Sequence, residues 1–153
     1  RRIQSSRHPA LRASRRAGLP SRGMWPRYDG LRTLELGSPG KMRTWLTDLV
    51  RSGTKRATFG LLDHDYAAEG EPVEHVGEIL VVLDDEGRDA CRVRVVEVRE
   101  CAFSEITWEM AAREGEGDAD LDAWRAGHLR FWTGEGFDIT PDTQVAWIAF
   151  DLA

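Results

Sequence analysis

The stretch "ACRVRVVEVREC" (residues 90–101) predicts one long strand whose buried side changes partway along it. Its apolar residues first occupy odd positions and then even ones, with the change falling between Val95 and Val96. Such a one-residue slip turns the side chains over unless a bulge absorbs it. Because bulged long strands allow a sheet to curve, the stretch predicts a strongly bent sheet.

The segments on either side of this strand predict an α+β domain. "EILVVLD" (78–84) has the apolar run of a buried strand and is joined to the long strand by the turn "DEGR". The remaining pattern predicts further strands at 31–36, 57–62 and 143–152, and helices at 41–53, 104–115 and 118–132. The order β-α-β-β-β-α-α-β favours a largely antiparallel, bent or closed sheet with flanking helices.

Turn and cap residues mark the ends of the predicted helices. Gly53 is typical of the position just after a helix. Ser104 is a suitable N-cap for the helix that closes at Gly115, and Asp118 is suitable for the next helix.

Charge divides the chain into two parts. Residues 1–23 contain seven Arg and no acidic residue, which leaves 14 Lys+Arg against 26 Asp+Glu for residues 24–153, or 14 − 26 = −12. The basic segment is typical of a transit-like peptide, a nucleic-acid arm, or translated sequence ahead of the true start, and Met24 favours the last. We expect 1–23 to be a mobile tail or a non-native extension, and 24–153 to be a single domain.

The acidic domain limits the classes of ligand. Long nucleic acids bind largely through Lys and Arg that release counterions, so the charge favours a small, nearly neutral ligand. No apolar run approaches the roughly 18 residues that span a bilayer, and no membrane partner is expected. Cys91 and Cys101 lie roughly 33 Å apart along one predicted strand, so we expect reduced, partly buried thiols and a cytoplasmic protein.

"SGTKRATFG" (52–60) offers a possible nucleophile and base, Thr58 and Lys55. A threonine hydroxyl needs a base beside it, and a lysine serves only when neutral, which burial or a neighbouring charge such as Arg56 favours. In a strand, residues three apart point to opposite faces, whereas in a turn entering a strand both can converge. The alternative is a solvated lysine after a helix.

"AREGEGD" (112–118) alternates acids with glycines. Glu114, Glu116 and Asp118 could orient a lysine, protonate a leaving group or bind a divalent cation. The alternative is an acidic turn between two helices.

"WRAGH" (124–128) adds Trp124, Arg125 and His128, either as a base-stacking surface or as a core Trp with a hydrogen-bonded interior His. No CxxC or HxxxH spacing is present, so neither a metal nor a cofactor is predicted.

Three segments together resemble the ASCH domain family: "GTKRAT" (53–58), "LLDHDYAAEGEP…VGEILVVLD" (61–84) and "AREGEGDADLDAWRAGHLRFW" (112–132). The resemblance covers about residues 31–153 in the expected order. It implies a PUA-like fold, which is a small β-barrel with flanking helices, and an RNA or nucleoside ligand.

The resemblance also implies two activities. Some ASCH proteins are amidohydrolases that deacylate N4-acylcytidine with a Thr–Lys–Glu triad, which corresponds here to Thr58, Lys55 and Glu114. Arg56, Glu116, Trp124, Arg125 and His128 are then candidates for binding the substrate. Other members resemble ribonucleases that use the same lysine, but their motif usually continues with a serine where this chain has Asp120.

Three functions are therefore open. Hydrolysis of N4-acetylcytidine is the leading hypothesis, cleavage of single-stranded RNA is the second, and a non-catalytic RNA-binding module is the third. The last would need a basic groove, and the densest supply of positive charge is Lys41, Arg43, Arg51, Lys55 and Arg56.

Overall fold

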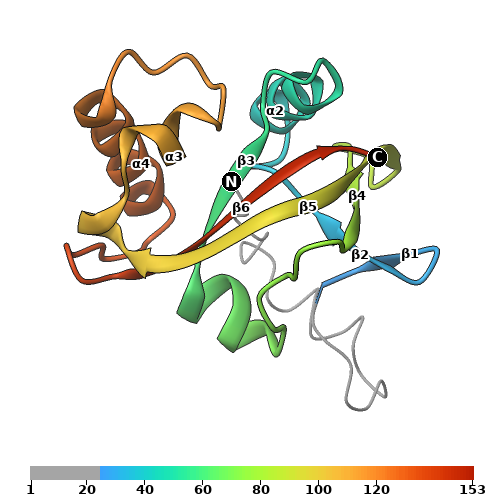
Figure 1. Cartoon of the computed structure of the whole chain (residues 1–153), viewed down its shortest axis with the longest axis horizontal. Helices are drawn as coiled ribbons and strands as arrows, with labels where there is room; N and C mark the ends of the chain where they lie inside the picture. The colour runs from blue at the N-terminus through green and yellow to red at the C-terminus, as the bar shows by residue number, and fades with distance from the viewer. Residues whose placement is uncertain (1–24) are drawn as a thin grey trace.

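The computed structural model describes residues 25–153, so the predicted tail at 1–23 lies outside the described residues. These residues form an α+β fold with one six-stranded sheet (Figure 1). The strands are β1 (Arg27–Tyr28), β2 (Leu31–Leu34), β3 (Ala57–Leu61), β4 (Ile79–Leu83), β5 (Asp89–Ala102) and β6 (Gln144–Leu152). Their order across the sheet is β1-β2-β4-β5-β6-β3.

The sheet is mostly antiparallel, as predicted, and only the β2–β4 pair is parallel. It is bent but does not close into a barrel, because β1 and β3 remain its two outer strands in this order. The bend falls where the sequence predicts it. Val95 pairs with Phe150 and Glu97 with Ala149, so Val96 is the extra residue of a bulge in β5.

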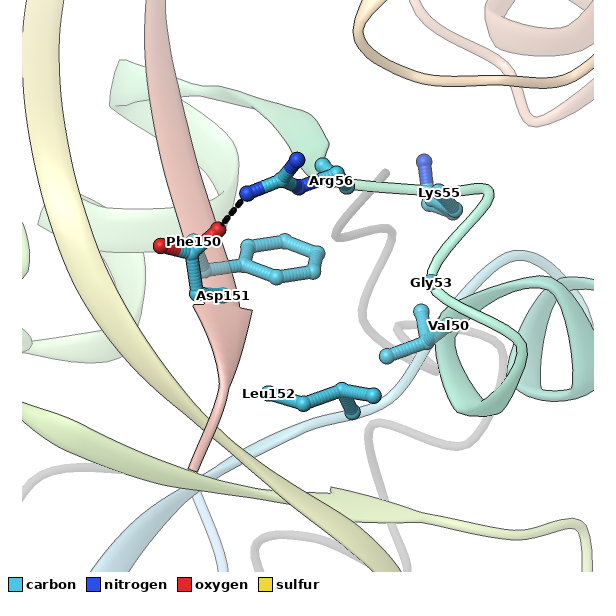
Figure 2. Close-up of a pocket in the computed structure, with 7 residues that line it drawn as sticks. All are labelled: Val50, Gly53, Lys55, Arg56, Phe150, Asp151 and Leu152. Atoms are coloured by element: carbon cyan, nitrogen blue, oxygen red, sulfur yellow. Dashed lines mark hydrogen bonds and ion pairs between the residues drawn. The ribbon is translucent and has the colours of Figure 1, made fainter.

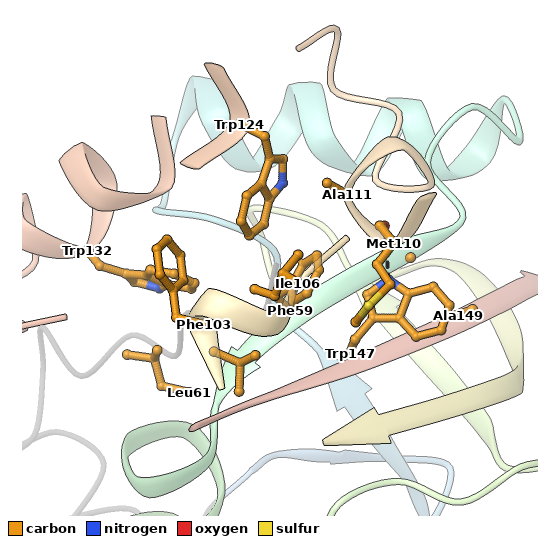
Figure 3. Close-up of a cluster of buried hydrophobic side chains, with 12 residues drawn as sticks. Phe59, Leu61, Phe103, Ile106, Met110, Ala111, Trp124, Trp132, Trp147 and Ala149 are labelled. Atoms are coloured by element: carbon orange, nitrogen blue, oxygen red, sulfur yellow. Dashed lines mark hydrogen bonds between the residues drawn. The ribbon is translucent and has the colours of Figure 1, made fainter. Parts of the chain in front are cut away.

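Helices cover the two faces of the sheet separately. The helices are α2 (Lys41–Arg51), α3 (Trp108–Ala112) and α4 (Leu121–Gly134), with short helical turns at Leu62–Tyr66, Ala67–Glu69 and Phe103–Glu105. Alternate side chains of β3 and β6 point to opposite faces of the sheet and pack in different hydrophobic clusters. Phe59 and Trp147 pack under α3 and α4 (Figure 3). Ile148 packs instead with Leu46 and Val50 of α2.

Two helix boundaries differ from the prediction. The expected helix at 104–115 is a 3₁₀ turn followed by α3, because Ile106 is extended and separates the two. Thr107, not Ser104, is the N-cap of α3 and accepts a hydrogen bond from Met110 N at 3.3 Å. The cap of α4 is Asp120 rather than Asp118, since its carboxylate accepts from Ala123 N at 2.8 Å.

The structure also bears on the predictions for Gly53, the two cysteines and membrane-spanning helices. Gly53 takes a left-handed conformation just after α2, with φ of 79°, as predicted. Cys91 and Cys101 are free and partly buried, and burial raises the pKa of both thiols. Within residues 25–153, none of the helices has the length and apolar character needed to cross a membrane.

Candidate active site

Lys55 lies in the short segment between α2 and β3, at the free edge of the sheet. Its main-chain N–H donates to Leu49 O at 3.0 Å, which keeps the segment against the end of α2. Arg56 O accepts from Phe150 N of β6 at 2.9 Å. Because successive carbonyls of a strand point in opposite directions, Ala57 O faces outward, where it accepts from Lys55 Nζ at 2.8 Å.

The "EGEGD" turn packs directly on this segment. Arg56 N donates to Arg113 O at 2.9 Å. Gly115 has φ of 62°, and a Cβ at this position would lie only 2.0 Å from Thr54 O. A glycine is therefore required here both by conformation and by space. This contact brings the acidic turn to Lys55.

Lys55 is buried between two carboxylates. Its Nζ lies 3.0 Å from Glu114 Oε2 and 2.8 Å from Glu116 Oε2. The other oxygen of Glu114, Oε1, accepts from Trp124 Nε1 at 2.8 Å and lies 2.8 Å from His128 Nε2. We call these five residues the Lys55–Glu114 cluster: Lys55, Glu114, Glu116, Trp124 and His128.

The electrostatics of the cluster favour an ionised Glu114. Complete burial by itself would raise the pKa of this carboxyl, but the charges of Lys55 and His128 outweigh it and hold the pKa well below its usual range. Both ring nitrogens of His128 face oxygens, since Nδ1 lies 3.0 Å from Trp124 O.

Trp124 and His128 support Glu114 from the core. Their side chains are buried, and their rings stack with centroids 3.9 Å apart. Phe59 of β3 packs on Trp124 at 4.9 Å. This arrangement matches one of the two alternatives that the sequence offered, a core Trp with a hydrogen-bonded interior His. The other alternative, contact of these rings with a substrate, remains a prediction.

Thr58 is close to Lys55 in sequence but lies on the other face of β3. It pairs with Ile148, whose side chain belongs to the α2 core, whereas Ala57 and Phe59 face α4. Thr58 is 1% exposed. Its Oγ1 has no hydrogen-bond partner among residues 25–153. A buried hydroxyl without a partner costs free energy, so its presence at the sheet edge requires an explanation.

The two predicted arginines lie outside the cluster. Arg56 is half-exposed and forms an ion pair with Asp151. Arg125 Nη2 donates to Ser104 O at 3.2 Å and to Ile106 O at 3.0 Å, so this side chain ties α4 to the turn before α3. Sequence reasoning missed Asp151, which belongs to no motif, and the Ala57 carbonyl, because a main-chain group carries no signal in the residue type.

Glu114, Glu116 and His128 are also the described residues best placed to bind a metal ion. One ligand atom of each lies within 4.8 Å of the others. The Lys55 ammonium already contacts both carboxylates, so it supplies the positive charge that a cation would bring.

Comparison with known proteins finds solved structures that are similar to this chain. An ASCH domain from Lactobacillus crispatus JV V101 is similar, with 27% identity and a TM-score of 0.67 over 77% of this chain and 76% of that one. Protein EF3133 from Enterococcus faecalis V583 is similar at 26% identity and a TM-score of 0.67, over 78% of this chain and 74% of that one. No curated protein sequence matches. Residues 33–153, which include the whole Lys55–Glu114 cluster, match the family model of the ASCH domain, and the chain therefore belongs to the ASCH domain family.

Proposed function

We propose that this protein is an amidohydrolase that removes the acyl group from N4-acylated cytidines such as N4-acetylcytidine. The observation that carries the proposal is that two buried polar groups lie near the start of β3, on opposite faces of this strand. One is a lysine fixed between two glutamates. The other is the Thr58 hydroxyl, which no hydrogen bond among the described residues occupies. A nucleophile must keep its oxygen available for attack.

The reaction begins with proton transfers inside the cluster. Glu114 is ionised and fixed by several donors, so Glu116 is the carboxylate that takes a proton from the Lys55 ammonium. A substrate that covers the sheet edge excludes water, and a lower dielectric favours the neutral form of such a pair. Thr58 lies on the other face of β3, so the transfer of its hydroxyl proton to neutral Lys55 requires the segment before β3 to rearrange when the substrate binds.

Thr58 Oγ1 next attacks the acyl carbonyl. The C–N bond breaks, and the cytosine amino group leaves with a proton from Lys55. Water then hydrolyses the threonyl ester and restores the hydroxyl. Glu114 positions Lys55 throughout, and Trp124 and His128 position Glu114.

Cleavage of RNA is the second candidate, and Asp120 bears on it. The related ribonucleases usually have serine at this position, and the difference counts against nuclease activity if that serine takes part in RNA cleavage. Asp120 is the N-cap of α4, and serine and aspartate are both good N-cap residues. The difference is therefore compatible with one shared structural role, the N-cap of α4. A non-catalytic RNA-binding module is the third candidate, but residues 24–153 carry a net charge of 14 − 26 = −12.

The test is hydrolysis of N4-acetylcytidine by the wild-type chain and by Thr58→Val and Thr58→Ser. Chromatographic release of cytidine is expected for the wild type and, more slowly, for Thr58→Ser. Thr58→Val should fall to the uncatalysed background because it lacks the nucleophile. Glu100→Gln, an exposed change on β5, is the control and should match the wild type.

The outcomes separate the candidates. Hydrolysis by Thr58→Val at the wild-type rate would remove Thr58 from the mechanism. No hydrolysis by the wild type would show that the proposed function is wrong, and cleavage of a labelled single-stranded RNA by the same proteins would then test the second candidate.

A further inference from the structure

The two carboxylates that hold Lys55 form a site for a cation, and the lysine ammonium occupies it. Glu114 Oε2 and Glu116 Oε2 lie 3.0 Å and 2.8 Å from Lys55 Nζ. In Figure 2 the Lys55 amino group points away from the cavity of about 260 Å³ that lies on the α2 side of its segment. The ammonium is therefore directed at the carboxylates of the cluster and not into this cavity.

His128 adds a nitrogen ligand to this pair of carboxylates. Its Nε2 lies 2.8 Å from Glu114 Oε1, and one ligand atom of each of Glu114, Glu116 and His128 lies within 4.8 Å of the others. Ligand atoms that bind a tetrahedral zinc ion at its usual distances are about 3.4 Å apart. The three groups would therefore have to approach one another by no more than about 1.4 Å to hold the ion.

Two of these ligands are fixed in place, and the third has room to adjust. Trp124 Nε1 donates to Glu114 Oε1 at 2.8 Å, and Trp124 O lies 3.0 Å from His128 Nδ1. A hydrogen bond at one ring nitrogen is the usual way in which proteins orient an imidazole whose other nitrogen binds a metal. Glu116 is followed by Gly117, where an added Cβ would meet nothing within 4 Å. The open turn therefore lets Glu116 approach an ion.

The ligand types select for a transition metal. Mg²⁺ and Ca²⁺ prefer oxygen ligands alone, whereas one imidazole with two carboxylates suits Zn²⁺. Three protein ligands leave the fourth position of a tetrahedral ion to water. Zn²⁺ would displace the Lys55 ammonium from both carboxylates and release any proton bound to His128 Nε2.

We propose that Glu114, Glu116 and His128 form an inhibitory Zn²⁺ site, for which the ion competes with the Lys55 ammonium. The site itself rests on the geometry of the cluster. Its inhibitory effect rests on the proposed amidohydrolase activity, because that mechanism needs a carboxylate that accepts a proton from Lys55.

Calorimetric titration with Zn²⁺ tests the site in the absence of any substrate. Lys55→Met should bind one Zn²⁺ ion at least about tenfold more tightly than the wild type, because its buried carboxylates lack a cation. Adding His128→Gln should weaken this binding by about 10–100-fold or more, since the loss of a residue that merely orients a ligand costs that much. Adding His75→Gln instead is the matched control and should have no effect, since His75 is exposed and lies outside the cluster.

Equal affinities of the wild type and Lys55→Met for Zn²⁺ would overturn the site, and so would unchanged binding after His128→Gln. If Lys55→Met does not fold without metal, Zn²⁺ should restore its cooperative thermal transition, because metal binding is coupled to folding. A variant that stays unfolded with Zn²⁺ would contradict the proposal as well.

Inhibition is measured separately, by hydrolysis of N4-acetylcytidine by the wild type. Saturating Zn²⁺ should lower kcat by about 100-fold or more, because it removes acid–base catalysis by Lys55. Binding of Zn²⁺ that leaves kcat unchanged would overturn the inhibitory role. No hydrolysis without metal would overturn the amidohydrolase and the inhibitory role together, whereas the zinc site would still be decided by calorimetry.

Discussion

At the scale of single residues, we expect the Thr58 hydroxyl to be needed for catalysis and not to stabilise the fold. Because Oγ1 is buried without a partner among the described residues, Thr58→Val should leave the free energy of unfolding unchanged or raise it by up to about 1 kcal/mol. Urea denaturation measures the change. Thr33→Val is the matched control, since Thr33 is equally buried and its Oγ1 donates to Pro26 O at 2.8 Å.

The control should lose about 1 kcal/mol, because the Pro26 carbonyl would lose its donor. A comparable loss in Thr58→Val would show that the hydroxyl stabilises the fold, and the argument that it is kept for catalysis would fail.

Glu114 is the residue on which the cluster depends. Glu114→Gln leaves Lys55 with one fewer charged partner in a buried site, and removing one member of a buried ion pair costs about 3–5 kcal/mol. We expect a loss of this size at pH 7 by urea denaturation. Glu100→Gln, on the exposed side of β5, should cost little.

The same variant tests the pH dependence. Since folding lowers the pKa of Glu114 from 4.5, the unfolded chain binds its proton first as the pH falls. The stabilisation is therefore complete above pH 4.5 and declines as the pH falls through the folded pKa. Thermal denaturation between neutral and acidic pH should show a shallower decline for Glu114→Gln than for the wild type. Parallel curves would contradict an ionised Glu114 in the fold.

At the scale of elements, the approach of the "EGEGD" turn to the segment before β3 depends on one glycine. Gly115 and Gly117 both have positive φ, but only Gly115 lacks space for a Cβ. Gly117→Ala should cost about 1–2 kcal/mol for its left-handed conformation alone. Gly115→Ala should cost clearly more, because the turn must move away from Thr54 and weaken the Arg56–Arg113 hydrogen bond.

Unfolding free energies of the two variants provide the comparison, and kcat of any that fold shows whether Lys55 has lost its carboxylates. Equal stability losses would mean that the turn adapts without cost, and that the close approach is not what positions Glu114.

At the scale of the whole molecule, charge separates a nucleoside from RNA. Residues 24–153 carry a net charge of −12, from 14 − 26, and a nearly neutral nucleoside makes no phosphate contacts. Its KM should therefore stay nearly constant between about 50 and 200 mM salt, whereas a ligand held through several phosphates would lose affinity steeply over this range. Steady-state kinetics at several salt concentrations test this, and a steep rise in KM would favour a polyanionic substrate.

The sequence by itself determined the α+β class, the antiparallel tendency and the bulge at Val96, because these follow from the periodicity of neighbouring side chains. It also placed Lys55 just after a helix and Glu114 in a glycine-rich turn. The sequence did not determine the N-cap of α3, since Ser104 and Thr107 are both good N-cap residues. Thr107 is the N-cap because the extended Ile106 separates Ser104 from the helix.

Only the tertiary structure decided which of these residues meet. Lys55 and Glu114 are 59 positions apart, and no local pattern states that a turn will dock on the edge of β3 or that Trp124 and His128 will support its carboxylate. The face on which Thr58 lies was also open, because Lys55 precedes the strand while Thr58 is inside it. Periodicity describes one element at a time, whereas a buried charge network and a cavity arise from the packing of several.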